Sequence, residues 1–172
     1  MTELKLARCT VRPWRVGDEI SLERYANNRN VSRNLRDIFP YPYTTADATA
    51  WIERVKDESP TLNFAIDVDG AGVGGISVML REDIYRQSAE IGYWLGEPFW
   101  GRGIATESLR AITDHAFATF PIIRLEAGVY SWNPASARVL EKVGYTLEGR
   151  LRQAVTKDGR VGDRLIYGLL RP

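Results

Sequence analysis

The sequence has one cysteine, one histidine, no long apolar run and almost no net charge. A single cysteine, Cys9, excludes an internal disulfide and suits a reducing compartment, so we expect a cytoplasmic protein. The lone histidine, His115, belongs to no cluster of metal ligands, which argues against a bound metal. No segment approaches the roughly 18 apolar residues of a membrane span, and the N-terminus lacks the apolar core of a signal peptide. We therefore expect no membrane partner.

The charges are balanced. Lysine and arginine together number 23 against 22 acidic residues, so the formal net charge is +1. This balance, with arginines scattered along the chain, disfavours a nucleic-acid partner. At 172 residues and 44% hydrophobic content, the chain is long enough for one domain, expected to span residues 1–172. It is compatible with a monomer or a homodimer.

Apolar periodicity and turn residues predict that strands and helices alternate. Strands are expected at 4–12, 62–68, 73–80, 90–95, 122–130, 145–155 and 160–170. Helices are expected at 18–26, 45–55, 103–119 and 134–142, with a short helical piece within 31–39. This order predicts one α/β or α+β domain.

Several residues predict where these elements begin, turn and end. Asp18 is a plausible N-cap, and Asn133 with Gly144 marks the two ends of the last helix. Asp69-Gly70 predicts a hairpin, although Gly72 suggests a loop longer than two residues. Gly74 and the glycine after it suggest a bulge or a close backbone approach within a strand.

Residues 90–107 organise the rest of the chain. Ile91, Tyr93 and Leu95 alternate with the residues at 90, 92 and 94, as in a half-buried strand. Gly101 and Gly103 then permit a tight turn before a helix, whose first N–H groups favour an anion. Two glycines before a helix also serve geometry alone, and both interpretations stay open at this point.

The same stretch resembles the acetyl-CoA-binding motif of the GNAT superfamily of N-acetyltransferases. The family pattern is Gln or Arg, two residues, Gly, one residue, then Gly or Ala, and Trp100, Gly103 and Ala105 fall on it. Trp100 departs from the first position, where backbone amides do the binding. Residues 93–106 are most similar to the RimJ/RimL branch, which acetylates N-termini of ribosomal proteins.

The resemblance implies a fold and a cosubstrate. The expected fold is a single GNAT-like domain with a mixed, mostly antiparallel central sheet of about seven strands, flanked by about four helices. The strand at 90–95 and the next strand, 122–130, should splay apart in a V that holds acetyl-CoA. No metal is implied.

The resemblance also implies the cofactor contacts. The turn would hold the pyrophosphate through N–H groups, and the backbone of 93–95 would pair with the pantetheine arm. Arg102 could reach a phosphate, or it could be a solvated loop charge. The implied cofactor-binding residues are Tyr93, Trp94, Leu95, Trp100, Gly101, Arg102, Gly103, Ile104, Ala105, Thr106, Asn133, Ser136 and Lys142.

A second part of the family pattern carries the expected acid. It reads Asn, two residues, Ala or Ser, and later Glu-Lys-x-Gly-aromatic, and residues 133–145 match it. Asn133 would hydrogen-bond the pantetheine arm, or act only as an N-cap, and the two roles are compatible. Leu140 stands where many relatives carry the tyrosine that protonates the leaving thiolate. By analogy with the RimJ/RimL branch we assign that acid to Ser136, with a plain helix-start hydroxyl as the alternative.

Glu90 is the best single candidate for the base, because its position matches a glutamate that several relatives use, usually through water. A solvated or salt-bridged strand glutamate is the alternative. Family analogy also predicts an acceptor site walled by Arg33, Tyr41, Tyr43 and Trp51, although most of these residues could equally serve packing.

The predicted activity is acetyl transfer from acetyl-CoA to a primary amine, by direct attack in a ternary complex. The RimJ/RimL resemblance favours the α-amine of a protein or peptide N-terminus. A polyamine or aminoglycoside acceptor, or a non-catalytic acetyl-CoA sensor, stays an alternative. A dinucleotide oxidoreductase is disfavoured, because Thr106 occupies the third glycine position of that fingerprint.

Overall fold

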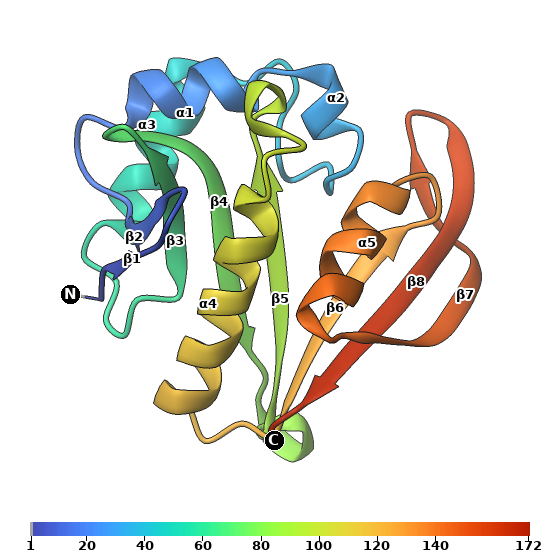
Figure 1. The fold of residues 1–172 in the computed structure, drawn as a ribbon. Coiled ribbons are helices and arrows are strands. Elements are labelled where there is room, and N and C mark those ends of the chain that lie inside the picture. The colour runs from blue at the N-terminus through green and yellow to red at the C-terminus, as the bar shows by residue number, and fades with distance from the viewer. Residues whose placement is uncertain (1) are drawn as a thin grey trace. The chain divides into compact units, whose positions relative to one another are not determined.

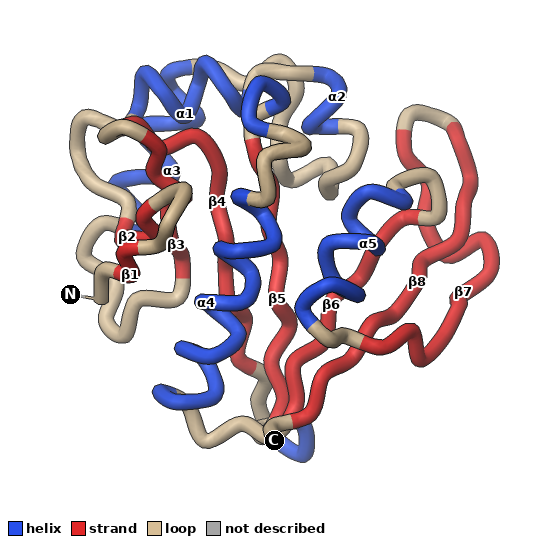
Figure 2. Tube along the Cα trace, in the orientation of Figure 1, coloured by secondary structure: helices blue, strands red, loops and turns tan. Residues whose placement is uncertain are grey.

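The computed structural model describes residues 2–172, which contain eight strands and five α-helices (Figures 1 and 2). The strands are β1 Leu4–Lys5, β2 Thr10–Pro13, β3 Asn63–Val68, β4 Ala71–Leu80, β5 Ser88–Leu95, β6 Arg124–Tyr130, β7 Thr146–Lys157 and β8 Arg160–Leu170. The helices are α1 Glu19–Ala26, α2 Arg29–Ser32, α3 Thr45–Val55, α4 Ile104–Thr119 and α5 Pro134–Val143. Two 3₁₀ turns, η1 Asp83–Tyr85 and η2 Glu97–Phe99, flank β5. None of the helices in residues 2–172 combines the length and the apolar character of a membrane span.

The strands hydrogen-bond in the order β1-β2-β3-β4-β5-β6-β8-β7. The pair β5–β6 is parallel, whereas β1–β2, β2–β3, β3–β4, β6–β8 and β7–β8 are antiparallel. The predicted mixed, mostly antiparallel α/β sheet is therefore confirmed.

One predicted strand is wrong in detail, and it explains the difference between about seven strands and eight. Residues 4–12 do not form one strand, because the N–H of Leu6 bonds the carbonyl of Cys9 and turns the chain back. The N–H groups of Ala7 and Arg8 in this turn both donate to the carboxylate of Glu107. A hydrogen-bond acceptor about a hundred residues away, Glu107, thus stabilises a turn that the local alternation of apolar and polar residues does not predict.

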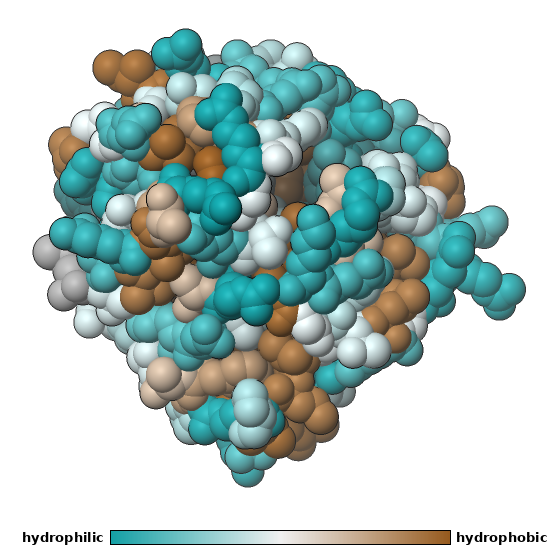
Figure 3. Space-filling view, viewed as in Figure 1, coloured by the Kyte–Doolittle hydropathy of each residue, from teal (hydrophilic) through white to brown (hydrophobic). Residues whose placement is uncertain are grey.

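The chain forms two compact units. The first comprises residues 2–77 and 93–108, and the second comprises residues 78–92 and 109–172. Hydrophilic residues cover much of the face seen in Figure 3, and hydrophobic residues there lie in separate patches.

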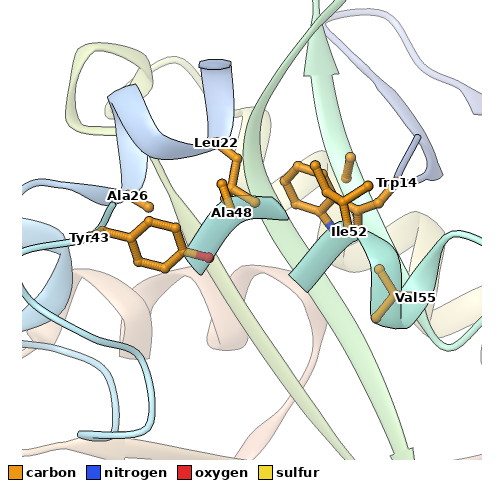
Figure 4. Packing of buried hydrophobic residues seen from close by; sticks show 8 residues of the cluster. Trp14, Leu22, Ala26, Tyr43, Ala48, Ile52 and Val55 are labelled. Atoms are coloured by element: carbon orange, nitrogen blue, oxygen red, sulfur yellow. The ribbon is translucent and has the colours of Figure 1, made fainter. Parts of the chain in front are cut away.

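The first unit is built around a buried cluster beneath α1 and α3 (Figure 4). Its buried members are Trp14, Leu22, Ala26, Tyr43, Ala48, Ile52, Val55 and Ala65, with Phe39, Trp51 and Trp94 packed against them. Thr44 begins α3 with a full capping box, in which its hydroxyl accepts from the N–H of Asp47 and the Asp47 carboxylate accepts from the N–H of Thr44. The predicted start of this helix is confirmed.

A buried ion cluster joins β2, β3 and the start of α1. Arg12 is 4% exposed, and its guanidinium donates to Asp18 through two bonds of 2.8 Å and to Asp67 at 2.7 Å. Asp18 is at the N-cap position of α1, as expected, but its side chain makes no capping bond, because Arg12 occupies it. The predicted capping by the Asp18 side chain is therefore wrong, and this carboxylate forms an ion pair with Arg12 instead.

The glycines of β4 bring strand β5 close. Asp69 and Gly70 have φ of +54° and +86° and form a two-residue hairpin loop, so the longer loop suggested by Gly72 is wrong. A Cβ on Gly74 would lie 2.5 Å from the Trp94 carbonyl oxygen, and one on Gly75 would lie 2.8 Å from the Trp94 indole nitrogen. The predicted close approach is confirmed.

The second unit contains β6, β8 and β7 with α5. Strand β6 pairs with β8 along its whole length, from Arg124–Leu170 to Tyr130–Arg164. Its parallel register with β5 covers only three pairs, from Ser88–Arg124 to Glu90–Glu126. Within this unit, the parallel pairing of the two strands thus ends at Glu90 and Glu126.

Replacing Arg12 by methionine should be strongly destabilising, because two carboxylates would stay buried without their cation. We expect a loss of about 3–5 kcal/mol in the free energy of unfolding, measured by urea titration. Arg15→Met is the matched control. Arg15 approaches the same two aspartates at 3.7–4.0 Å, but its side chain is 59% exposed, so we expect a loss of at most about 1 kcal/mol. Equal losses in the two variants would contradict the buried-cluster interpretation.

Candidate functional site

Two hydrogen bonds hold the end of β5 in place. The indole N–H of Trp100 donates to the carbonyl of Leu95 at 2.7 Å, and the N–H of Gly96 donates to the carbonyl of Val73 at 2.8 Å. Trp100 is 44% exposed, so its side chain bonds the last residue of the strand without entering the core. This bond gives a physical reason for the tryptophan at the first motif position.

The turn after β5 is tied to the start of α2 through Glu97. Its carboxylate accepts from the side-chain amide of Asn28 at 2.7 Å and from that of Asn30 at 3.0 and 3.2 Å. These bonds, that of Asn28 first and that of Asn30 second, lower the pKa of Glu97 below its ordinary value. The ring of Phe99 in the same turn packs edge-on against Tyr25 at 5.2 Å.

The turn itself has the backbone that the two glycines were predicted to provide. Gly101 and Gly103 have φ of +74° and +78°, in the region that favours glycine, and α4 begins at Ile104. The first N–H groups of α4 lack helical partners and make this end favourable for a phosphate. Arg102 is exposed, with its guanidinium 5.4 Å from the ring centroid of Phe99.

Arg8 adds a second positive charge at the turn, and no pattern in the sequence predicts its position there. A Cβ placed on Gly103 would lie 3.6 Å from Nε of Arg8, so the guanidinium borders the loop. Arg8 reaches this place because Glu107 binds its N–H group, and the two side chains also form an ion pair of 3.8 Å. The contact depends on the turn between β1 and β2, which local periodicity does not predict.

The predicted acceptor residues lie in the first unit with different exposures. Tyr43 is 5% exposed, contacts the ring of Phe39 at 5.0 Å, and burial raises its pKa to about 12. Trp51 is half-buried on α3 beneath the guanidinium of Arg54. Tyr41 is 47% exposed and Arg33, after α2, is exposed. Tyr43 and Trp51 therefore contribute to packing in the first unit, while Tyr41 and Arg33 face solvent, and an acceptor site walled by the four residues stays a prediction.

The second unit carries the predicted acid and the pantetheine contact. The side-chain oxygen of Asn133 accepts from the N–H of Ser136 at 3.3 Å, so the predicted N-cap is confirmed. Ser136 is half-buried in the first turn of α5, and Lys142 is exposed in its last turn. Leu140 between them is fully buried.

Glu90 is part of an ion-pair network in the second unit. Its carboxylate lies 3.1 Å from Nη2 of Arg164 and 3.8 Å from Nη2 of Arg81, and its side chain is 31% exposed. Arg81 also donates to Glu126, the residue that pairs with Glu90 across the parallel strands. The salt-bridged strand glutamate, offered as the alternative for Glu90, is therefore observed.

These strand, turn and helix features agree with a comparison against known families. A family model described as an acetyltransferase (GNAT) domain matches residues 8–146. The chain belongs to the GNAT acetyltransferase family. As a GNAT protein it is an acetyl-CoA-dependent N-acetyltransferase.

The relatives place this GNAT protein near the RimJ/RimL branch, as the motif predicted. It is 34% identical to a probable N-acetyltransferase, YjcK, of Bacillus subtilis strain 168, over 94% of this chain and 93% of that protein. It is 35% identical to the ribosomal-protein-serine acetyltransferase of Escherichia coli K12, over 54% of this chain and 52% of that one. The solved structure of Mycobacterium smegmatis RimJ in complex with CoA-disulfide superposes with a TM-score of 0.81 and 26% identity, covering 94% and 81% of the two chains.

Gly103→Val should remove acetyl-CoA binding by this GNAT protein, because a β-branched residue is strained at φ of +78°. Acetyl-CoA at about 100 times its Kd should stabilise the natural protein by about 2.7 kcal/mol, which a thermal shift detects. The matched control is Gly159→Val. Gly159 has φ of +73° and no atom within 4 Å of a built Cβ, but it lies in the β7–β8 hairpin. A shift that survives in Gly103→Val would reject the phosphate-loop assignment.

Proposed function

We propose that this protein transfers the acetyl group of acetyl-CoA to the α-amine of a protein or peptide N-terminus, by direct attack in a ternary complex. The observation that carries the proposal is the turn from Leu95 to Ile104. There a strand end, the 3₁₀ turn η2, two glycines at positive φ and a helix N-terminus follow one another. The name of the Escherichia coli relative, a ribosomal-protein-serine acetyltransferase, supports a protein acceptor.

In this proposal the turn binds the pyrophosphate of acetyl-CoA. The N–H groups from Gly101 to Ala105 would contact the phosphate oxygens, and Arg8 and Arg102 would add positive charge beside them. The backbone of Tyr93–Leu95 would pair with the pantetheine arm. The carbonyl of Leu95 is already bonded to Trp100, so the pairing would use the strand before it.

The reaction joins the acceptor nitrogen to the carbonyl carbon of the thioester and breaks the carbon–sulfur bond. The amine must be neutral, the tetrahedral oxygen needs a hydrogen-bond donor, and the departing thiolate needs a proton. Ser136 is the proposed donor of that proton. Its competitor is water, because the buried Leu140 has no proton to give.

Removal of the amine proton is assigned to Glu90 acting through water. The ion pairs with Arg164 and Arg81 hold this carboxylate in position. Because Glu90 is the one base that the proposal assigns, an amine that is already partly neutral in solution suits this site best. An α-amine fulfils this condition and a lysine side chain does not.

Ser136→Ala should lower kcat more than it changes KM for acetyl-CoA, because a proton donor acts mainly in the transition state. We expect a loss of about 10²-fold or more in kcat. Alanine keeps the N–H that donates to Asn133, so the start of α5 is preserved, and Ser136→Thr should restore part of the rate. If the alanine variant keeps the natural kcat, Ser136 is only a helix-start residue and water supplies the proton.

The acceptor class is tested with two peptides of one sequence at pH 7. One has a free N-terminus and a blocked lysine, and the other has the reverse. An α-amine with a pKa of about 7.7–8.0 falls short of its neutral form by about 1.4 kcal/mol, whereas lysine at about 10.4 falls short by about 4.6 kcal/mol. We expect a higher kcat/KM for the free N-terminus, measured as thiol release.

A preference for the lysine peptide would reject the α-amine assignment. Turnover of a polyamine or aminoglycoside with neither peptide reacting would leave only the broader acetyltransferase activity. Binding of acetyl-CoA without turnover of any amine would favour the sensor alternative.

A further inference from the structure

Residues 29–43 carry a concentration of positive charge in a nearly neutral chain. The range contains Arg29, Arg33 and Arg36 against a single acidic residue, Asp37. All three arginines are exposed. We call residues 29–43 the arginine segment.

The arginine segment lies beside the end of β5 and the turn that follows it. At its start, the side chains of Asn28 and Asn30 bond the carboxylate of Glu97 in that turn. Further along, the ring of Phe39 packs against Trp94 of β5 at 5.5 Å. The segment therefore borders the end of the strand whose backbone would pair with the pantetheine arm in the proposed function.

The apolar and aromatic residues of the segment divide into two sets. Tyr43 is buried, and its N–H donates to the side chain of Asn27, which fixes the end of the segment to α1. Ile38 is 76% exposed and Tyr41 is 47% exposed, with the guanidinium of Arg29 over the Tyr41 ring at 5.2 Å. The exposed surface of the segment thus combines guanidinium groups with apolar side chains. This combination suits a peptide better than a small ion.

The carboxylate of Glu97 beside the segment is bonded by two neutral amides, those of Asn28 and Asn30. Within residues 29–43, three arginines stand against one aspartate, so the segment carries a net positive charge. Guanidinium groups bind carboxylates through paired N–H donors, and their combined field attracts a negatively charged chain. The same field repels a polyamine, whose amines are cationic at neutral pH.

We propose that the acceptor is a protein or peptide N-terminus followed by acidic residues, and that Arg29, Arg33 and Arg36 bind those carboxylates. This inference rests on the proposed function and names the class of its acceptor. The α-amine would reach the thioester while the residues after it lie along the arginine segment. The arginines act in binding and add no chemical step.

The test uses three peptides with one N-terminal residue and no lysine. Positions three to five are acidic, neutral or arginine. We expect kcat/KM to fall in that order, with about tenfold between the acidic and neutral peptides, as a few exposed ion pairs supply together. The advantage should shrink between about 0.05 M and about 0.3 M salt, because exposed charges are screened.

Charge reversal then identifies the residues. Arg33→Glu and Arg36→Glu should each reduce or invert the preference for the acidic peptide and leave the thermal shift with acetyl-CoA unchanged. The matched control is Lys5→Glu, an equal change of charge at an exposed position of β1. It should keep the natural order of the peptides.

Each outcome has a separate meaning. Equal turnover of all three peptides would overturn the acidic-acceptor inference and leave the proposed function intact, as would a loss of preference in Lys5→Glu as large as in the segment variants. Turnover of spermidine with no peptide reacting would reject both the inference and the proposed function.

Discussion

The buried guanidinium of Arg12 fixes the start of the first helix, and the residues that follow the other end of that helix depend on it. By bonding Asp18 and Asp67, Arg12 joins α1 to β2 and β3 in a region where water is excluded. The other end of α1 leads directly into residues 27–30, which hold Tyr43 and Glu97. The turn that would bind acetyl-CoA is therefore positioned by an ion cluster at the opposite end of a short helix.

Glycines within the strands leave space for long side chains from neighbouring strands. Gly74 and Gly75 leave room for Trp94, which supports Phe39 of the arginine segment. In the second unit a Cβ on Gly128 would collide with the guanidinium of Arg164. The absence of that Cβ lets Arg164 lie over β6 and reach Glu90 on β5. The proposed base is thus held by a residue 74 positions away, through space that a glycine provides.

Features that depend on neighbouring residues could be predicted from the sequence. The hairpin at Asp69-Gly70, the capping of α5 by Asn133 and the glycine turn at 101–103 all follow from local backbone chemistry. The division of residues 4–12 into two strands could not be predicted, because its cause is Glu107. The place of Arg8 and the amide contacts of Glu97 likewise depend on residues 67–99 positions apart. For the same reason the sequence predicts a salt bridge at Glu90 only as an alternative. It does not predict that the partners are Arg164 and Arg81.

The proton that the amine must lose connects the chemistry of the reaction to the choice of acceptor. The proposal assigns a single base, Glu90, so the neutral fraction of the amine that solution supplies matters for the rate. Every α-amine offers a similar neutral fraction near pH 7, and proton removal alone cannot distinguish one N-terminus from another. In the proposed function, selectivity among N-termini would then come from the residues that follow the amine, which the exposed arginines of the arginine segment would bind. Proton chemistry would select the class of amine, and surface charge would select the chain that carries it.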